Sequence, residues 1–337
     1  MSAKRRIIPV FVPHLGCPND CVFCNQRRIS GSLEPATAET VTKAIASAGC
    51  CDGDLSQWEL AFYGGSFTAI EESERVKLLS ATEDFVKRGG SLRLSTRPDC
   101  INADILVQLK KAGVKTIELG CQSMDNEVLR KSGRGHFAED TVNAVKLIKE
   151  HGFNLILQMM TGLPGDSFEK SFYTAQRLAE LKPDGVRIYP TVIIRDTPLY
   201  DKWKAGTYKE HTVEEAVNWC SKILPVFHEA QIPVIRLGLN PTDDLSGGDA
   251  LAGAYHPAFG ELVYSKMYLN RARELLNGIQ GAKTVHIGVS PSSLSKMIGQ
   301  KKCNIAALKR EFNLEEIKIQ CISELEKEEV RLIYIEK

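Results

Sequence analysis

The feature that most constrains the fold of this sequence is a regular alternation of short apolar runs with longer stretches of helical periodicity. Such alternation is typical of βα units that build a parallel sheet, so the predicted fold class is α/β. Strands are expected at 6–14, 58–65, 92–99, 116–123, 154–162 and 186–193, with a seventh at 232–239. Helices are expected at 36–49, 71–88, 102–112, 138–151, 167–181 and 212–230.

The pattern changes past about residue 280. There we expect a strand (KTVHIGVSP), two helices (SLSKMIG and NIAALKREFN) separated by a tight polar turn, and two strands (IKIQCIS and VRLIYIE). Upstream, residues 240–260 are rich in Gly and Asp and are expected to form a loop before a helix at 261–277. We therefore expect two domains, a barrel at 1–278 and a small α+β module at 279–337.

Charge and composition exclude several classes of protein. The chain has 337 residues, with 43 Lys and Arg against 42 Asp and Glu, so its net charge is only +1. Any attraction to nucleic acid or membranes must therefore come from a local patch of charge. Hydrophobic residues make up 43%, which excludes a disordered or collagen-like chain. No run approaches the ~20 apolar residues of a membrane span, and no signal peptide is expected. Its ten cysteines are expected to be reduced thiols in the cytoplasm.

Three of the cysteines lie close together in the sequence CPNDCVFC, directly after the first expected strand. Cys17, Cys21 and Cys24 can converge on one metal site. A structural zinc site needs four protein ligands, and His14 is the nearby residue that would complete one. An iron–sulfur cluster held by three thiolates instead leaves one iron open for a substrate or cofactor. A zinc site and a chance grouping of thiols stay open as alternatives.

This C-x3-C-x2-C motif after the first strand resembles that of the radical S-adenosylmethionine (SAM) superfamily. The resemblance implies a partial (β/α)6-type TIM-like barrel in which Cys17, Cys21 and Cys24 bind a 4Fe-4S cluster. It further implies that the fourth iron chelates SAM, and that one electron cleaves SAM to a 5′-deoxyadenosyl radical. The cofactor would carry this chemistry while the protein orients and shields it.

Further residues match the family's SAM contacts in chain order. The contacts implied by the resemblance are Phe23, Gly64, Gly65, Ser66, Thr96, Arg97, Gln122, Arg134, Gln158 and Tyr189. Ser66 stands where the family often has Glu, so we expect a backbone role for that segment. Taken singly, each residue is explained as well by a turn or a solvated side chain. The assignment depends on all of them following the expected strands in the same order as in the family. His256 is a candidate catalytic residue, with a turn-stabilising role as the alternative.

Two branches of the superfamily are similar to this chain. The segments 95–99, 117–136 and 184–206 resemble the radical domain of the Elongator catalytic subunit, which modifies the wobble uridine of transfer RNA. The cysteine spacing and the Gly162-Leu163-Pro164-Gly165 turn are also similar to relatives of oxygen-independent coproporphyrinogen oxidase. The C-x3-C spacing is shorter than in Elongator, and we expect neither its N-terminal RNA-binding extension nor its acetyltransferase domain. Acetyl transfer is therefore left open.

The segment Val289 to Ile319 resembles a small KH-like RNA-binding unit, in which a GXXG loop between two helices clamps the nucleic-acid backbone. The loop here is Gly299, Gln300, Lys301 and Lys302, with Lys302 in place of the second glycine. Residues 283–318 carry seven basic and three acidic side chains, and residues 1–31 carry five and one, so each region has a local charge of +4. Phosphate binding needs such patches, although the solvated face of a packing domain would look similar.

The function predicted from the sequence is a radical SAM enzyme that modifies RNA, supplied with electrons by a flavodoxin or ferredoxin. One alternative keeps the radical chemistry for a small molecule such as a tetrapyrrole, with the C-terminal residues serving as a lid or dimer surface. A second alternative is a non-catalytic RNA-binding protein with a structural metal.

Overall fold

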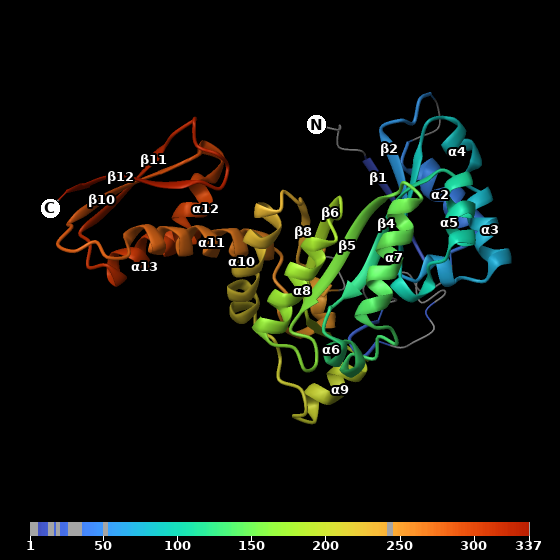
Figure 1. The fold of residues 1–337 in the computed structure, drawn as a ribbon, viewed down its shortest axis with the longest axis horizontal. Coiled ribbons are helices and arrows are strands. Elements are labelled where there is room, and N and C mark those ends of the chain that lie inside the picture. The colour runs from blue at the N-terminus through green and yellow to red at the C-terminus, as the bar shows by residue number, and fades with distance from the viewer. Residues whose placement is uncertain are drawn as a thin grey trace. The chain divides into compact units, whose positions relative to one another are not determined.

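A computed structural model of the chain describes residues 6–12, 17, 21–25, 36–49, 53–240 and 245–336 (Figure 1). The chain divides into two compact units. The first combines Met1–Thr212 with Pro225–Pro257, and the second combines Val213–Leu224 with Ala258–Lys337.

The boundary between the units differs from the expected position at 278/279. Helix α11 (Phe259–Leu276) belongs to the second unit and buries Val263, Met267 and Tyr268. The amide of Asn304 also donates hydrogen bonds to the carbonyl and the hydroxyl of Ser265 in this helix, at 2.9 and 3.1 Å. Because its apolar face is needed to cover the C-terminal sheet, α11 is part of that fold rather than the end of the barrel.

Seven strands of the described chain form one parallel sheet in the first unit, and their order in space is their order in the sequence. They are β1 (Arg6–Phe11), β2 (Trp58–Tyr63), β3 (Ser91–Thr96), β4 (Val114–Gln122), β5 (Asn154–Thr161), β6 (Gly185–Pro190) and β8 (Val234–Leu237). A parallel sheet wound in one direction without reversal is the arrangement of a βα barrel left open at one side. The predicted fold class is confirmed, and the seventh expected strand is present.

Helices follow the strands as expected. They are α2 (Ala38–Ser47), α3 (Glu72–Ser80), α4 (Glu83–Lys87), α5 (Ala103–Lys111), α6 (Asn126–Lys131), α7 (Ala138–Glu150), α8 (Phe168–Glu180), α9 (Pro198–Lys204) and α10 (Val213–Glu229). The side chains of Asn102, Asp125, Ser167 and Thr197 accept hydrogen bonds from backbone N–H groups in the first turns of α5, α6, α8 and α9. The segment predicted as one helix at 71–88 is two helices, α3 and α4, and α6 and α9 were not predicted.

A two-stranded ribbon follows β6. Strand β7 (Val192–Ile194) pairs antiparallel with β9 (Ala250–Gly253), so part of the segment expected to be a loop at 240–260 is a strand. A side chain at Gly253 would meet the carbonyl oxygen of Thr191 at 2.8 Å, and its φ is +87°, so the close pairing requires glycine. The ribbon covers its own small core, in which Val192 and Ile194 are buried.

The second unit has a three-stranded sheet in the order β11-β10-β12. Strand β10 (Thr284–Val289) is parallel to β11 (Glu316–Cys321) and antiparallel to β12 (Val330–Glu336). Helices α12 (Leu294–Ile298) and α13 (Cys303–Glu311) connect the parallel pair, as the sequence predicts. Within the described chain, every helix is too short or too polar to cross a membrane.

Candidate functional site

The carboxyl ends of the parallel strands lie at one edge of the sheet, because every strand runs in the same direction. Gly64 follows β2, Thr96 ends β3 and Gln122 ends β4, while Gln158 and Tyr189 lie in the last halves of β5 and β6. The structure therefore brings residues predicted as SAM contacts from five strands to the same end of the barrel.

The described part of the cysteine segment is held by backbone hydrogen bonds to two other loops. The amide of Val22 donates to the carbonyl of Ser132 at 3.0 Å, and the amide of Leu199 donates to the carbonyl of Val22 at 2.8 Å. Phe23, predicted as a SAM contact, packs with Val22 against a hydrophobic cluster formed by Ile193, Leu199 and Tyr208. Its observed contacts therefore anchor the segment to β7 and α9.

Cys21 is buried, and Cys17 and Cys24 are half-buried. Burial raises the pKa of the Cys17 thiol, and the neighbouring Cys21 thiol adds to the increase. Arg97, Arg134 and a backbone hydrogen bond from Ser66 act in the opposite direction. Cys17 and Cys21 thus share one electrostatic environment. Among the described residues no three His, Cys, Asp or Glu side chains are arranged to hold a metal ion.

Two buried arginines border these thiols. Both oxygens of Asp99 accept hydrogen bonds from Arg97, each at 2.9 Å, and Arg97 Nη2 also donates to the carbonyl of Arg134. Arg134 Nη1 donates to Cys21 Sγ at 3.2 Å, and its Nη2 donates to the carbonyl of Gly120 at 2.6 Å. Within the described chain, Arg97 Nη1 and Arg134 Nε are buried without an acceptor.

Buried cationic N–H groups that have no acceptor indicate where an anionic group belongs. Soft thiolate donors beside two guanidinium groups suit an iron–sulfur cluster and a ligand carboxylate. The residues present at this edge of the sheet therefore fit the cofactors that the cysteine motif predicts.

The hydroxyl groups of Ser66 and Thr96 contact one another rather than an open space. Ser66 Oγ lies 3.0 Å from Thr96 Oγ1, which lies 2.5 Å from Thr68 Oγ1. All three side chains are buried. Gly64 has a φ of +99°, so the chain turns sharply before this hydroxyl cluster. The Ser66 hydroxyl is thus engaged within the chain, and the backbone role of Gly64, Gly65 and Ser66 stays a prediction.

Gln122 has a left-handed backbone conformation, with a φ of +66°, at an irregularity in the pairing of β4 with β5. A residue other than glycine in this region costs about 1–2 kcal/mol, and such strain concentrates at functional sites. The Gln122 side chain accepts a hydrogen bond from Gln158 Nε2 at 3.2 Å. The two glutamines predicted as SAM contacts are therefore adjacent.

An ion-pair network inside the barrel was missed in the sequence analysis. Arg93 lies 2.8 Å from carboxylate oxygens of both Glu59 and Glu118, and Arg187 Nη2 donates to Glu118 at 2.9 Å. Arg187 Nη1 also donates to the hydroxyl of Tyr189 at 3.2 Å, which links a predicted SAM contact to the network. Its signal in the sequence was one charged residue inside each of four apolar strands: WELAFY, SLRLST, TIELG and VRIYP.

Tyr63 joins the same network from the end of β2. Its hydroxyl lies 3.3 Å from Glu118 and donates to that carboxylate. Burial raises the pKa of the Tyr63 phenol, and the negative charge of Glu118 raises it further. The phenol is therefore protonated at physiological pH and serves as a hydrogen-bond donor.

His136, two residues after Arg134, is also buried at this edge. Burial lowers its pKa to about 3, and the positive charge of Arg134 contributes. The imidazole is therefore neutral at physiological pH, and its Nε2 lies 3.3 Å from the carbonyl of Cys121. Because His136 is uncharged, the positive charge described next to the thiols comes from Arg97 and Arg134.

The turn after β5 is fixed by Asp166, whose carboxylate accepts hydrogen bonds from the amides of Gly162 and Ser167 at 2.8 and 2.9 Å. Ser171 Oγ donates a third at 2.7 Å. Burial raises the pKa of Asp166 to about 6 in spite of these donors. Asp166 is therefore a buried support for the Gly-Leu-Pro-Gly turn.

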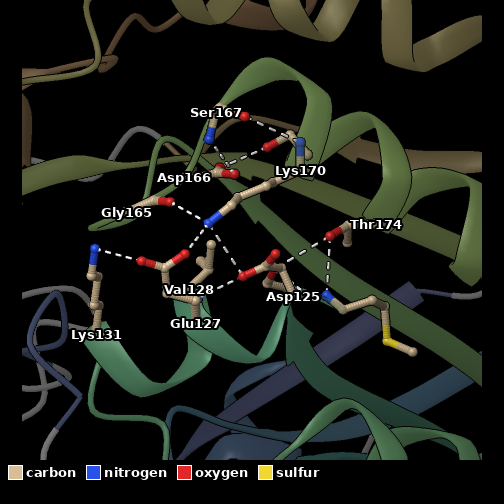
Figure 2. A network of polar contacts seen from close by, with 12 residues as sticks. Asp125, Glu127, Val128, Lys131, Gly165, Asp166, Ser167, Lys170 and Thr174 are labelled. Carbon is tan, nitrogen blue, oxygen red and sulfur yellow. Dashed lines mark hydrogen bonds and ion pairs between the residues drawn. The ribbon is translucent and has the colours of Figure 1, made fainter.

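Lys170 ties this turn to the loop after β4, as Figure 2 shows. Its Nζ lies 2.6 Å from Glu127 and 3.5 Å from Asp125, and it donates to the carbonyl of Gly165 at 3.0 Å. The loops that follow Gln122 and Gln158 are thus held together by one side chain.

Substitution of Gly162 by alanine is expected to destabilise the first unit by about 2–4 kcal/mol, because it combines two penalties. Gly162 has a φ of +77°, and an added Cβ would lie 2.3 Å from Cγ of the buried His211 ring. Gly206 is the matched control, since its φ is +71° but nothing lies within 4 Å of an added Cβ. Urea denaturation of both variants measures the difference, and equal losses would refute the predicted overlap with His211.

Other predicted residues have less structural support. His256 is half-buried and lies in the segment that follows β9 in the sequence, and its catalytic role stays a prediction. His14 and most of the basic residues of the first 31 lie outside the described residues.

Comparison with protein families gives two matches. Residues 11–178 match the radical SAM superfamily, and residues 183–269 match a radical SAM C-terminal domain. Together these matches cover most of the first unit and part of the second. The chain belongs to the radical SAM superfamily, whose enzymes use a 4Fe-4S cluster and SAM. The superfamily predicted from the cysteine motif, and with it the predicted cofactors, are confirmed.

Individual relatives narrow the resemblance to the Elongator branch. The chain is 32% identical over 213 residues to the tRNA uridine(34) acetyltransferase of Methanocaldococcus jannaschii, covering 61% of this chain and 37% of that protein. It is 34% identical over 209 residues to the Elongator complex protein 3 of Dictyostelium discoideum, covering 60% and 36%. The matched region thus spans little more than a third of these relatives.

Solved structures show the same fold. The archaeal Elp3 of Methanocaldococcus infernus with an N-terminal deletion superposes with a TM-score of 0.62 at 24% identity, covering 80% of this chain and 64% of that chain. Coproporphyrinogen III oxidase of Escherichia coli superposes with a TM-score of 0.50 at 18% identity, covering 67% and 53%. Each predicted branch thus has a member with a similar fold, and the Elp3 structure matches more of this chain than the oxidase does.

Proposed function

We propose that this chain cleaves SAM reductively and uses the resulting radical to modify an RNA, with transfer RNA as the substrate class. The observation that carries the proposal is that one chain has both a site of thiols and arginines in the first unit and a basic turn in the second. The sequence similarity to tRNA uridine(34) acetyltransferase and Elongator complex protein 3 supports the choice of transfer RNA. Location in the cytoplasm and an electron from a flavodoxin or ferredoxin complete the proposal.

In this proposal Cys17, Cys21 and Cys24 hold the 4Fe-4S cluster. When bound, the cluster and SAM supply a 5′-deoxyadenosyl radical. The buried Arg97 offers its unpaired Nη1 to the SAM carboxylate, and two hydrogen bonds to Asp99 fix the orientation of its guanidinium group. The backbone after Gly64 allows close approach of the amino group. Gln122 and Gln158 orient the ribose, and Tyr189, held through Arg187, faces the adenine.

The turn between α12 and α13 supports the RNA substrate. Gly299, Lys301 and Lys302 have φ values of +75°, +51° and +63°. Lys302 thus adopts the left-handed conformation that glycine favours, at the position where a GXXG loop has its second glycine. Lys301 and Lys302 are both exposed, so the turn presents two adjacent ammonium groups on a tight bend. Such a bend suits contact with a phosphate backbone.

Reversal of both charges, in a Lys301→Glu/Lys302→Glu variant, is expected to weaken RNA binding and to flatten its dependence on salt. Loss of two phosphate contacts should reduce the slope of log Kd against log salt by about 2. Fluorescence anisotropy with unmodified transfer RNA at several salt concentrations measures it. Lys111→Glu/Lys115→Glu, which makes the same charge change at exposed positions in the first unit, is the control. Equal affinity and slope for both double variants and the wild type would argue against RNA binding by this turn.

The substrate itself is tested by mass spectrometry of RNA nucleosides from a deletion strain and its parent. The proposal expects one modified nucleoside to disappear from transfer RNA in the deletion strain and to return when the gene is restored. Identical nucleoside profiles would instead favour a small-molecule substrate.

A further inference from the structure

Arg134 is placed where it contacts a proposed cluster ligand directly. Its side chain is buried, with 6% of its surface exposed, and it donates a hydrogen bond to Cys21 Sγ at 3.2 Å. We propose that Arg134 is a positioning residue that raises the reduction potential of the cluster by donating to the Cys21 thiolate. This inference rests on the proposed function, because it requires Cys21 to be a cluster ligand.

The geometry fixes the guanidinium of Arg134 rather than leaving it mobile. Its Nη2 donates to the carbonyl of Gly120 at 2.6 Å, which holds the plane of the group against the end of β4. Its own carbonyl accepts a hydrogen bond from Arg97, and its amide donates to the carbonyl of Leu129 at 3.1 Å. With its backbone held on both sides and Nη2 engaged at Gly120, the guanidinium directs Nη1 at the sulfur of Cys21.

The charge balance of the two arginines differs in a way that points to an anion at Cys21. Arg97 is neutralised by the carboxylate of Asp99, with which it forms two hydrogen bonds. In the described chain no carboxylate forms an ion pair with Arg134, although it is buried. A buried cation without a counter-charge is costly, so a stable site requires a negative group beside it. A metal-bound thiolate at Cys21 would supply that group.

Hydrogen bonds and positive charge at the sulfur ligands change the potential of an iron–sulfur cluster. Reduction adds one negative charge to the cluster, so a fixed donor next to a ligand sulfur stabilises the reduced form more than the oxidised form. Removing Arg134 should therefore lower the potential and make the cluster harder to reduce.

This role is separable from the SAM contact that the sequence predicts for Arg134. A residue that binds only the SAM carboxylate changes the affinity for SAM but leaves the potential of the SAM-free cluster unchanged. A donor to Cys21 changes the potential in the absence of SAM. The measurement is therefore made on the reconstituted protein without SAM.

The test uses Arg134→Gln and Arg134→Met, two neutral replacements of different shape, with Arg130→Gln as the control. Arg130 is an exposed arginine four residues away, so its replacement removes the same charge outside the site. Each full-length protein is reconstituted anaerobically, its iron and sulfide are assayed, and the cluster is titrated with reductant while its EPR signal is followed. Both Arg134 variants are expected to be at least tenfold harder to reduce, equivalent to a shift of about 59 mV to lower potential for one electron. Arg130→Gln should match the wild type.

The two possible failures are distinguishable. A wild type that takes up no iron–sulfur cluster would overturn the proposed function itself. A wild type and an Arg134 variant with equal cluster content and equal potentials would overturn the role of Arg134 and leave the proposed function intact. If one Arg134 variant fails to incorporate the cluster, the potential of the other is compared with that of the wild type.

Discussion

Replacement of Cys21 by alanine is expected to remove the bound cluster and to lower SAM-dependent formation of 5′-deoxyadenosine by at least about 100-fold. Cys21 is the buried member of the three thiols, and its Sγ accepts a hydrogen bond from Arg134. Its charge also contributes to the raised pKa of Cys17. A cluster with one open iron needs three thiolate ligands, and the variant has only two of them. Iron and sulfide content, visible absorption and chromatographic assay of 5′-deoxyadenosine measure the effect.

Cys303→Ala is the matched control for this prediction. Cys303 is an exposed free thiol in the second unit, so its loss should change neither the iron content nor the product. A Cys21→Ala protein that still binds four irons and forms 5′-deoxyadenosine at the wild-type rate would show that the cysteine motif does not hold the cluster.

Glu118→Ala is expected to lower the free energy of unfolding by about 3–5 kcal/mol, because it breaks a buried ion-pair network by removing its central carboxylate. Glu118 interacts with both Arg93 and Arg187, and its side chain is 4% exposed. Arg93 keeps a second partner in Glu59 after the substitution, whereas Arg187 loses the carboxylate it contacts in the described chain. A buried, uncompensated guanidinium is the main source of the loss.

Urea denaturation followed by tryptophan fluorescence measures this effect, since Trp58 lies on β2 of the same sheet. The control is Glu74→Ala, which removes a carboxylate from an exposed ion pair with Lys77 at 2.6 Å. Surface pairs of this kind contribute little, so this variant should unfold near the wild-type midpoint. Similar midpoints for Glu118→Ala and the wild type would contradict the structural role assigned to the network.

The parallel sheet was predictable because its strands are apolar runs separated by helices of ordinary length, a local pattern that needs no tertiary information. The errors in the fold have tertiary causes. Strand β9 has a weak local signal and forms because β7 pairs with it. Helix α11 belongs to the second unit because its buried face packs there, and the partner of an apolar helix face cannot be read from sequence periodicity.

The candidate site divides in the same way. The grouping of the three cysteines is visible in the sequence because their spacing is a local property, and their role as cluster ligands stays a prediction. The ion pairs among Glu59, Arg93, Glu118 and Arg187 join residues 25 to 69 positions apart and depend on strand register, which sequence periodicity does not provide. The contact of Arg134 with Cys21 spans 113 positions and arises from the turn after α6. The role of a lone arginine of this kind becomes visible only in three dimensions.

Cleavage of SAM at an iron–sulfur cluster can be tested in a single experiment on this chain. The full-length protein is purified and reconstituted anaerobically, then incubated with SAM and dithionite, and 5′-deoxyadenosine and methionine are quantified. We expect a coloured protein that binds four irons and releases the two products in equal amounts. A colourless protein that contains zinc and yields no 5′-deoxyadenosine would contradict it.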